Sequence, residues 1–263
     1  MILEKIAEKT VQRIEEQKKY VTLNQLKEKV SRLDINTGFP FEKALKKDDI
    51  AFICEVKKAS PSKNVISEDF SYLEIAQSYE KAGASAISVL TEPYFFQGSN
   101  SYLSEISEKV KVPCLRKDFT IDEYMIYEAK LLGASAILLI CAILDDNQLR
   151  EYSTTARELG LSVLTEAHTE EEVKRAIDSG ASIIGVNNRN LKNFEVDINN
   201  SIRLRDLVPS NIIYVSESGI TTSNDIHMLR KNGTDAVLIG ETLMRADDKK
   251  AKLDELRGAY DKD

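Results

Sequence analysis

After residue 48, short apolar runs alternate with longer segments in which apolar and charged positions recur at helical spacing. Each apolar run is rich in Ile, Val, Leu and Ala on both faces, which is typical of parallel strands covered by helices. The runs lie at 51–57, 86–91, 112–116, 136–141, 162–166, 183–187, 212–216 and 236–239. The pattern therefore predicts eight strand–helix units in succession.

A short stretch of sequence recurs four times where a helix gives way to the next strand. Its copies are KAGASAISVL (81–90), LLGASAILLI (131–140), DSGASIIGV (178–186) and KNGTDAVLI (231–239). In each copy we expect the first glycine to end the helix in the left-handed conformation, which lacks a steric penalty without a Cβ atom. The copies are 50, 47 and 53 residues apart, which matches two units of about 25 residues per interval.

Eight such units predict an α/β protein with a (β/α)₈ TIM barrel. The alternative is an open, doubly wound sheet. That fold would place a glycine-rich phosphate loop after the first strand, and the sequence has none there.

Residues 1–48 precede the first unit and indicate an N-terminal helical extension rather than a second domain. The extension carries an apolar stripe at helical spacing, made of Leu3, Ile6, Ala7, Thr10 and Ile14. A second short helix is predicted at 40–47. Two readings stay open, a packed cap that seals one end of the barrel and a lid that touches the substrate. We expect residues 1–263 to form a single barrel domain with this extension.

Two helix starts match the capping-box pattern, in which a hydroxyl and a carboxylate each accept an unpaired backbone N–H. They are Thr120 with Glu123 and Thr169 with Glu172. We therefore predict that helices begin at these two threonines.

Composition and charge exclude several classes of function. The 263 residues include 36 Lys and Arg against 43 Asp and Glu, a formal charge of −7, so no basic surface for nucleic acid or anionic lipid is indicated. The longest apolar run, at 136–144, is far shorter than the roughly 20 residues of a membrane helix. The beginning, MILEKIAEK, has no apolar segment of a signal peptide. We expect a cytoplasmic protein without a nucleic-acid or membrane partner.

The cysteines and histidines indicate neither disulfides nor a metal site. Cys54, Cys114 and Cys141 stand singly in strand-like runs, and the two histidines have no ligand-like spacing to any cysteine. His168 follows a predicted strand, where it either lines the barrel mouth or forms ordinary loop hydrogen bonds. His227 is expected on the surface of a helix.

The candidate chemistry lies at the carboxyl ends of the predicted strands, where active sites of such barrels are found. The polar groups and glycines there are Glu55, Lys57, Lys117, Glu166, Asn187, Arg189, Glu217, Ser218, Gly219, Gly240 and Glu241. Charges that face into a barrel mouth cost desolvation energy unless they are paired. A single one is readily explained as a solvated loop charge, but two lysines, three glutamates and an arginine converging there favour a catalytic site.

The glycines after the last two strands suggest a phosphate site. Backbone N–H groups at Gly219 and Gly240 lie where such barrels commonly bind phosphate, and Ser218 adds a hydroxyl. The plain alternative is a pair of ordinary tight turns. Because the charge of Glu241 is wrong for a phosphate, only its backbone N–H is expected to make contact.

At these strand ends the sequence resembles indole-3-glycerol phosphate synthase, over essentially the whole chain including the extension. The matching segments are EVKKASPSK (55–63), SVLTEPYFFQGS (88–99), LRKDF (115–119), LTEAH (164–168), GVNNRNL (185–191), SESGI (216–220) and IGETLM (239–244). Asn64 departs from the glycine that many members have, and asparagine tolerates the left-handed conformation that the loop requires.

The resemblance implies a barrel enzyme that needs neither metal nor organic cofactor. Its substrate would be 1-(2-carboxyphenylamino)-1-deoxyribulose 5-phosphate, which the family converts to indole-3-glycerol phosphate, CO₂ and water in tryptophan biosynthesis. The implied general acid is Lys117 and the implied general base is Glu166. The other implied catalytic residues are Lys57, Glu55, Asn187 and Ser218. The implied substrate-binding residues are Arg189, Glu217, Phe96, Pro61, Leu191 and Ser60, with phosphate bound at Gly219, Gly240 and Glu241.

Two alternatives remain open. A sugar-phosphate isomerase can use the same barrel and phosphate site, although it normally requires an Asp or Cys acid–base pair. A non-catalytic barrel that binds a phosphometabolite or a protein is the other, and the full set of strand-end charges argues against it. A Schiff-base aldolase is disfavoured because the sixth predicted strand ends without a lysine. The oligomeric state stays open, and a monomer is compatible with the sequence.

Overall fold

Eight parallel strands close into a barrel in the computed structural model, which describes residues 2–61, 64–66, 69–190 and 193–258. The barrel strands are β1 (Ala51–Val56), β4 (Ala86–Leu90), β5 (Cys114–Lys117), β6 (Ala136–Ile140), β7 (Ser162–Ala167), β8 (Ile183–Asn187), β9 (Ile213–Glu217) and β10 (Ala236–Ile239). They are hydrogen-bonded in chain order, and β10 pairs with β1 to close the ring. The predicted (β/α)₈ fold is confirmed.

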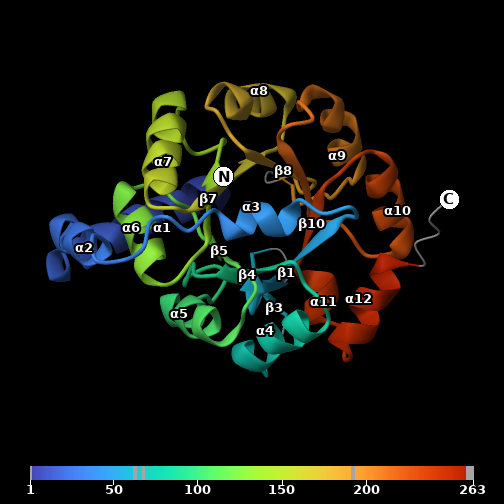
Figure 1. Cartoon of the computed structure of the whole chain (residues 1–263), viewed down its shortest axis with the longest axis horizontal. Coiled ribbons are helices and arrows are strands. Elements are labelled where there is room, and N and C mark those ends of the chain that lie inside the picture. Colours follow the sequence, from blue (N-terminus) through green and yellow to red (C-terminus); the bar gives the residue numbers. More distant parts are fainter. Residues whose placement is uncertain (1, 62–63, 67–68, 191–192, 259–263) are drawn as a thin grey trace.

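Helices surround the barrel and two short strands form a hairpin beyond β1 (Figure 1). The helices are α1 (Ile2–Tyr20), α2 (Leu23–Val30), α3 (Pro40–Leu45), α4 (Tyr72–Lys81), α5 (Asn100–Lys109), α6 (Glu123–Leu131), α7 (Asp146–Glu158), α8 (Glu170–Asp178), α9 (Asn199–Leu204), α10 (Ser223–Lys231), α11 (Glu241–Met244) and α12 (Lys249–Arg257). A 3₁₀ turn follows α9 at Arg205–Leu207, and the hairpin consists of β2 (Ala59–Ser60) and β3 (Asn64–Val65). Asn64 has φ 56°, so it adopts the predicted left-handed conformation.

The barrel interior is packed with apolar side chains below the mouth. Ile53, Leu115 and Leu164 are fully buried in this inner cluster, whereas Cys54 belongs to the outer cluster between strands and helices. Side chains alternate between the two faces of a strand. Because Ile53 points inward, Glu55 also points inward, one layer nearer to the mouth.

The recurring glycines end helices as predicted. After α4, Gly83 has φ 83°, and the next residue, Ala84, donates its backbone N–H to Tyr79 O at 3.0 Å. A residue with a Cβ would be strained in this conformation. The equivalent φ angles are 79° at Gly133, 82° at Gly180 and 75° at Gly233.

The N-terminal extension contacts the barrel at both ends. Helix α3 lies across the barrel (Figure 1) at the end where the strands begin, and its Phe41 and Leu45 are fully buried in the inner cluster. Helix α1 buries Leu3, Ile6, Thr10 and Ile14, which is the predicted stripe without its alanine. The cap interpretation therefore describes α3, whereas the first turns of α1 reach the opposite end.

The predicted helix starts are half right. Helix α6 is capped by Asp122, whose carboxylate accepts the Tyr124 N–H, so the capping box predicted at Thr120 is wrong. Helix α8 does begin at Thr169, which accepts the Glu172 N–H at 3.2 Å. The Glu172 carboxylate, however, accepts the backbone N–H of His168 instead of closing the box.

A buried ion pair joins α1 to the strand that carries Lys117. Arg13 donates to both carboxylate oxygens of Asp118 at 2.9 and 3.0 Å, and Thr91 Oγ1 donates to the same carboxylate at 2.7 Å. Burial alone would raise the pKa of Asp118, but Arg13 and Arg116 outweigh it and hold that pKa below its ordinary value. Asp118 is therefore ionised inside the protein, and α1 supplies its bidentate partner.

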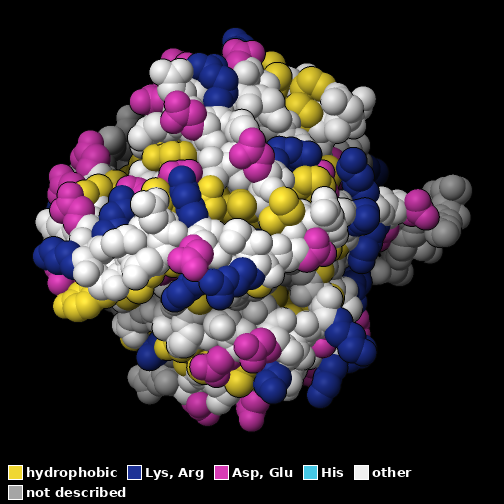
Figure 2. All heavy atoms as spheres, turned by 60° about the vertical axis from the view of Figure 1, so that its left-hand side comes forward, with side chains coloured by type: hydrophobic (Ala, Val, Ile, Leu, Met, Phe, Trp, Pro, Cys, Tyr) yellow, Lys and Arg dark blue, Asp and Glu magenta, His cyan; other side chains and the backbone are white. Residues whose placement is uncertain are grey.

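The surface carries both signs of charge. On the face drawn in Figure 2, Lys and Arg side chains are intermixed with Asp and Glu. The helices that come forward in this view contribute ion pairs such as Arg32–Glu28 at 2.8 Å and Lys27–Glu123 at 3.0 Å. Among the described residues, no helix combines the length and apolarity that crossing a membrane requires.

Replacing Arg13 should destabilise the protein. In Arg13→Met the Asp118 carboxylate loses its bidentate partner but stays buried, and we expect the free energy of unfolding in urea at pH 7 to fall by roughly 3 kcal/mol. A carboxylate with a lowered pKa contributes stability above its unfolded value and loses it on acidification. The difference from wild type should therefore narrow as the pH falls below the ordinary value of 3.8.

The matched control is Arg32→Met, which removes an exposed ion pair to Glu28. It should change the free energy of unfolding by less than about 1 kcal/mol. Equal losses in the two variants would show that the buried pair does not anchor α1.

Candidate active site

A cavity of about 900 Å³ opens at the carboxyl ends of the barrel strands. Most of the residues that the sequence analysis singled out line this cavity. Those that line it are Glu55, Lys57, Ser60, Pro61, Phe96, Lys117, Glu166, Asn187, Arg189, Glu217, Ser218, Gly219, Gly240 and Glu241. Leu191, expected beside them, lies outside the described residues.

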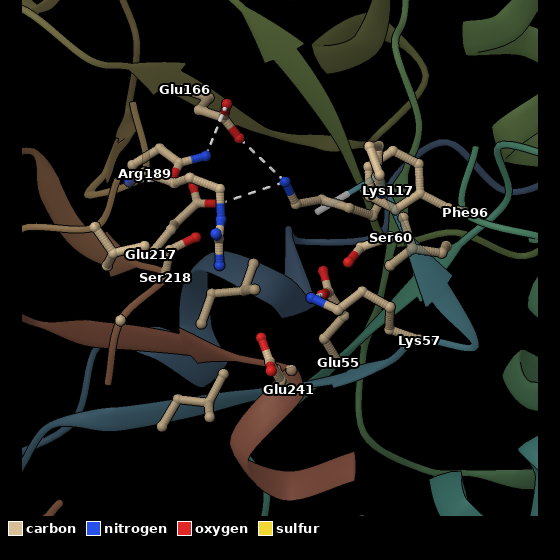
Figure 3. A pocket seen from close by; sticks show the side chains of 18 of the residues that line it. Glu55, Lys57, Ser60, Phe96, Lys117, Glu166, Arg189, Glu217, Ser218 and Glu241 are labelled. Carbon is tan, nitrogen blue, oxygen red and sulfur yellow. Dashed lines mark hydrogen bonds and ion pairs between the residues drawn. The ribbon is translucent and has the colours of Figure 1, made fainter. Parts of the chain in front are cut away.

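Lys117 lies between two carboxylates on the opposite wall. At the end of β5, its ammonium group points toward Glu166 on β7 and Glu217 on β9 (Figure 3). The Nζ atom is 3.0 Å from Glu166 Oε2 and 3.4 Å from Glu217 Oε2. Burial favours the neutral amine, but Glu166, Glu217 and Glu55 outweigh it and raise the pKa of Lys117 above its ordinary value. The lysine is a cation whose proton is directed into the cavity.

Lys57, directly after β1, forms a second lysine–glutamate pair with Glu55 on that strand. Its Nζ atom is 2.7 Å from Glu55 Oε1, and Ser88 Oγ donates to the other oxygen of Glu55 at 3.4 Å. A Cβ atom built on Gly240 would lie 2.5 Å from Glu55 Oε1 and 2.8 Å from Lys57 Nζ. A larger residue directly before α11 would therefore displace the ends of these two side chains.

Glu166 is surrounded by groups that stabilise its charge. Its Oε2 accepts from Lys117, while its Oε1 accepts from Asn187 Nδ2 at 3.3 Å and lies 3.4 Å from His168 Nε2. Burial raises the pKa of this carboxyl, but Lys117, His168 and the Asn187 hydrogen bond together lower it below the ordinary value. Glu166 is thus an ionised base that faces the cavity.

The pKa of Glu217 is shifted in the opposite direction to that of Glu166. Burial, together with the charges of Glu166 and Glu55, raises the pKa of Glu217 to about 7 despite the attraction of Lys117. Its Oε1 has no hydrogen-bond partner among the described residues and lies where a Cβ atom of Gly185 would be. A carboxyl that titrates near neutrality is not a feature that the sequence predicted.

The turn after β9 presents backbone groups to the cavity. Ser218 and Gly219 both have positive φ angles, 68° and 80°, and Asn188 Nδ2 holds the turn by donating to Ser218 O at 3.0 Å. On the neighbouring strand, β10 ends at Ile239, and Gly240 and α11 follow directly. These two turns are the elements that were expected to bind a phosphate.

The charge of Glu241 is balanced within its own helix. Arg245 Nε lies 3.1 Å from Glu241 Oε1, one turn further along. Figure 3 shows the carboxylate at the lower edge of the pocket. The pairing agrees with the expectation that the side chain of Glu241 does not serve an anion directly.

Aromatic and apolar groups form the remaining wall. Phe96 lies 5.9 Å from Phe119, measured between ring centroids. Its position is fixed by the buried Glu92, whose carboxylate accepts the backbone N–H groups of Phe95 and Phe96 at 2.7 and 3.0 Å. Pro61 lies on the same side, after the β2 strand.

Sequence reasoning missed several residues that line the cavity. Among them are Ile2, Leu3, Ile6, Phe119, Arg245 and Lys252. Phe119 follows Lys117 by two positions, so strand alternation contained a signal for it. The contribution of α1 and α12 depends on how these helices dock, which no local pattern specified. Within the described residues, no group of three or more His, Cys, Asp or Glu is arranged to hold a metal ion.

The raised pKa of Glu217 predicts a pH-dependent effect of its substitution. Because the folded state holds this proton more tightly than the unfolded chain does, ionising Glu217 lowers the stability of the wild type as the pH rises from about 4.5 to 7. Glu217→Gln removes this loss. Its free energy of unfolding relative to wild type should rise by up to about 3 kcal/mol between pH 5 and pH 8.

The measurement is urea unfolding at the two pH values, with Glu28→Gln as the control. Glu28 is exposed, so its variant should follow the wild-type pH dependence. A Glu217→Gln curve parallel to wild type would contradict the assignment of a proton to Glu217.

Comparison with known proteins shows the family of the chain. The family model of indole-3-glycerol phosphate synthase matches residues 3–256. The indole-3-glycerol phosphate synthase of Ruminiclostridium cellulolyticum is 60% identical over 259 residues, which cover 98% of this chain and 100% of the relative. That of Endomicrobium trichonymphae is 54% identical, with 98% and 100% covered. Among solved structures, 3-hexulose-6-phosphate synthase from Salmonella typhimurium superposes with a TM-score of 0.64 at 15% identity, covering 79% of this chain and 96% of that one.

The likeness to the Salmonella protein supports the fold alone, whereas the family match and the relatives extend over nearly the whole chain. The chain therefore belongs to the indole-3-glycerol phosphate synthase family.

Proposed function

We propose that the protein catalyses the decarboxylating, dehydrating ring closure of 1-(2-carboxyphenylamino)-1-deoxy-D-ribulose 5-phosphate to indole-3-glycerol phosphate, a step of tryptophan biosynthesis. The observation that carries the proposal is the pair of buried lysine–glutamate contacts, Lys117–Glu166 and Lys57–Glu55, that line one cavity. Condensation followed by dehydration requires both a proton donor and a proton acceptor next to the substrate, and this cavity offers both. Family membership supplies the reaction.

In this mechanism Lys117 is the general acid. As the aromatic carbon attacks the ketose carbonyl, negative charge develops on the carbonyl oxygen. The N–H bond of the ammonium breaks as an O–H bond forms there, which prevents a full alkoxide. The surrounding carboxylates keep Lys117 charged before the reaction, so a proton is available in every encounter.

Glu166 is the general base of the later dehydration, with Asn187 fixing its orientation through the 3.3 Å hydrogen bond. Lys57, held by Glu55, binds the substrate carboxylate or hydroxyls and assists the acid chemistry. Ser218 completes this set of catalytic residues and contributes a hydroxyl group.

The substrate lies with its two ends in different parts of the cavity. Backbone N–H groups at Gly219, Gly240 and Glu241 bind the phosphate, close to the two turns described above. The anthranilate ring packs against Phe96 and Pro61. The sequence resemblance assigns Leu191 to the same wall. Arg189, Glu217 and Ser60 line the remaining path between the two ends. This arrangement brings the reacting carbons next to Lys117.

We further propose that the enzyme acts in the cytoplasm, as a monomer and without a cofactor, on this small phosphorylated substrate. The three cysteines are buried free thiols, which suits a reducing compartment. The charged pairs of the site are formed within one chain, so a second subunit is not needed to complete them.

Direct assay tests the function. Incubating the protein with the carboxyphenylamino-deoxyribulose phosphate should release CO₂ and produce indole fluorescence together. A sugar-phosphate isomerase would give neither signal. A non-catalytic barrel would bind the compound and leave it unchanged.

Lys117→Met tests the general acid. Loss of the donated proton should lower kcat by roughly 10²- to 10⁴-fold, while the barrel stays folded by circular dichroism. The control is Lys231→Met at the exposed end of α10, which should retain wild-type turnover. A Lys117→Met enzyme with near-normal kcat would exclude the assignment.

Glu166→Gln tests the general base. Glutamine keeps the shape of the side chain but cannot accept the proton, so dehydration should slow after decarboxylation. In a single turnover, CO₂ should therefore appear before indole. Coincident time courses, together with a lower melting temperature, would instead assign Glu166 a purely structural role.

A further inference from the structure

His168 lies directly behind the proposed base and lines no part of the cavity described above. It follows β7 and is largely buried between two carboxylates. Its Nδ1 is 3.2 Å from Glu172 Oε2, and its Nε2 is 3.4 Å from Glu166 Oε1. Within the described residues the buried Nε2 has no hydrogen-bond partner, so its closest polar group is the oxygen of Glu166.

The ring is held from outside the barrel by Glu172. One oxygen of that carboxylate accepts the backbone N–H of His168 at 2.7 Å. The same oxygen contacts the ring Nδ1. Glu172 is itself fixed in the first turn of α8, where Thr169 accepts its N–H. Asn200 Nδ2 on α9 donates to the backbone oxygen of His168 at 3.1 Å. The ring therefore has a defined position with respect to Glu166.

Two ionised carboxylates cannot both be satisfied by a neutral imidazole. An ionised carboxylate only accepts hydrogen bonds, and a neutral imidazole has a single N–H. If Nδ1 donates to Glu172, a neutral Nε2 would direct a lone pair at Glu166. An imidazolium ring, which donates from both nitrogens, removes this conflict.

We propose that His168 is a positioning residue: as an imidazolium held by Glu172, it keeps Glu166 ionised while Lys117 transfers its proton to the substrate. The inference rests on the proposed function, because it assigns His168 a task within that reaction. His168 itself keeps its proton throughout. The N–H bond of Lys117 breaks and an O–H bond forms on the substrate. In the later dehydration, Glu166 accepts a proton from the substrate.

The need for a second cation follows from the role of Lys117. An opposite charge within about 4–6 Å lowers the pKa of a carboxyl by roughly 1 to 3. When Lys117 becomes a neutral amine, Glu166 loses that charge at 3.0 Å and tends to take up a proton prematurely. A protonated Glu166 cannot act as base in dehydration. His168 supplies a positive charge that the reaction does not consume.

The groups around the ring favour the charged form. Glu172 on α8 and Glu166 on β7 flank the ring, the charge of Glu217 on β9 acts on it from further away, and Lys117 on β5 pairs with Glu166. Burial lowers the pKa of His168, but the carboxylates outweigh it and raise that pKa above its ordinary value. Arg175, on the next turn of α8, donates to Cys141 O at 2.9 Å and Leu144 O at 2.6 Å. Cys141 Sγ contacts the backbone oxygen of Glu172.

The kinetic test compares His168→Gln with His227→Gln. Glutamine at 168 retains an N–H donor but carries no charge, so kcat should fall by about tenfold while KM stays within about twofold. The acidic limb of the kcat–pH profile should move to higher pH by roughly 1, because Glu166 protonates more readily. His227 lies exposed on α10, and its variant should match wild type. An unshifted acidic limb in His168→Gln would overturn the proposal.

A second test reads the ring directly and requires no turnover. The chain has two histidines, so ¹⁵N NMR of the His227→Gln protein reports on His168 alone. We expect its imidazole to be protonated at pH 7 and to lose this proton at lower pH in Glu172→Gln. A neutral ring at pH 7 would contradict the inference. Absence of turnover in wild type, by contrast, would refute the proposed function whatever the state of His168.

Discussion

The site depends on the neutralisation of charge inside an apolar barrel. Lys117 is buried and would be a neutral amine in an apolar environment, yet it is surrounded by carboxylates from β7 and β9 and by Glu55 on β1. These groups are far apart in the sequence and meet because parallel strands end at the same rim. Their mutual contacts keep Lys117 protonated and Glu166 ionised before any substrate arrives. Acid, base and a carboxyl that titrates near pH 7 thus coexist within one cavity.

Much of this arrangement could be predicted from the sequence, because the responsible signals are local. Strand alternation placed Glu55 above Ile53, and the recurring glycines marked where helices give way to strands. The same alternation contained Phe119, which was overlooked. The predicted start of α6 at Thr120 is wrong because Asp122 lies directly before the helix and offers the stronger cap.

Other features depend on tertiary contacts that no local pattern encodes. The raised pKa of Glu217 comes from its burial beside Glu166 and from the space that Gly185 leaves. The ion pair of Arg13 with Asp118 joins residues 105 positions apart. The raised pKa and the ion pair can be recognised only when the helices and strands are placed around the barrel. In the sequence, each of these charged residues looks the same as one exposed to solvent.

Helix α3 determines how molecules reach the site. Phe41 and Leu45 close the barrel at the end where the strands begin. The layer with Ile53 and Leu115 fills the interior between them and the cavity. In the described part of the chain, the cavity thus communicates with solvent at the rim. An incoming substrate and the departing gas, water and larger product share this passage. Because the opposite end is filled by side chains, a bulky ligand bound across the rim would block the entry of substrate and the exit of every product at the same place.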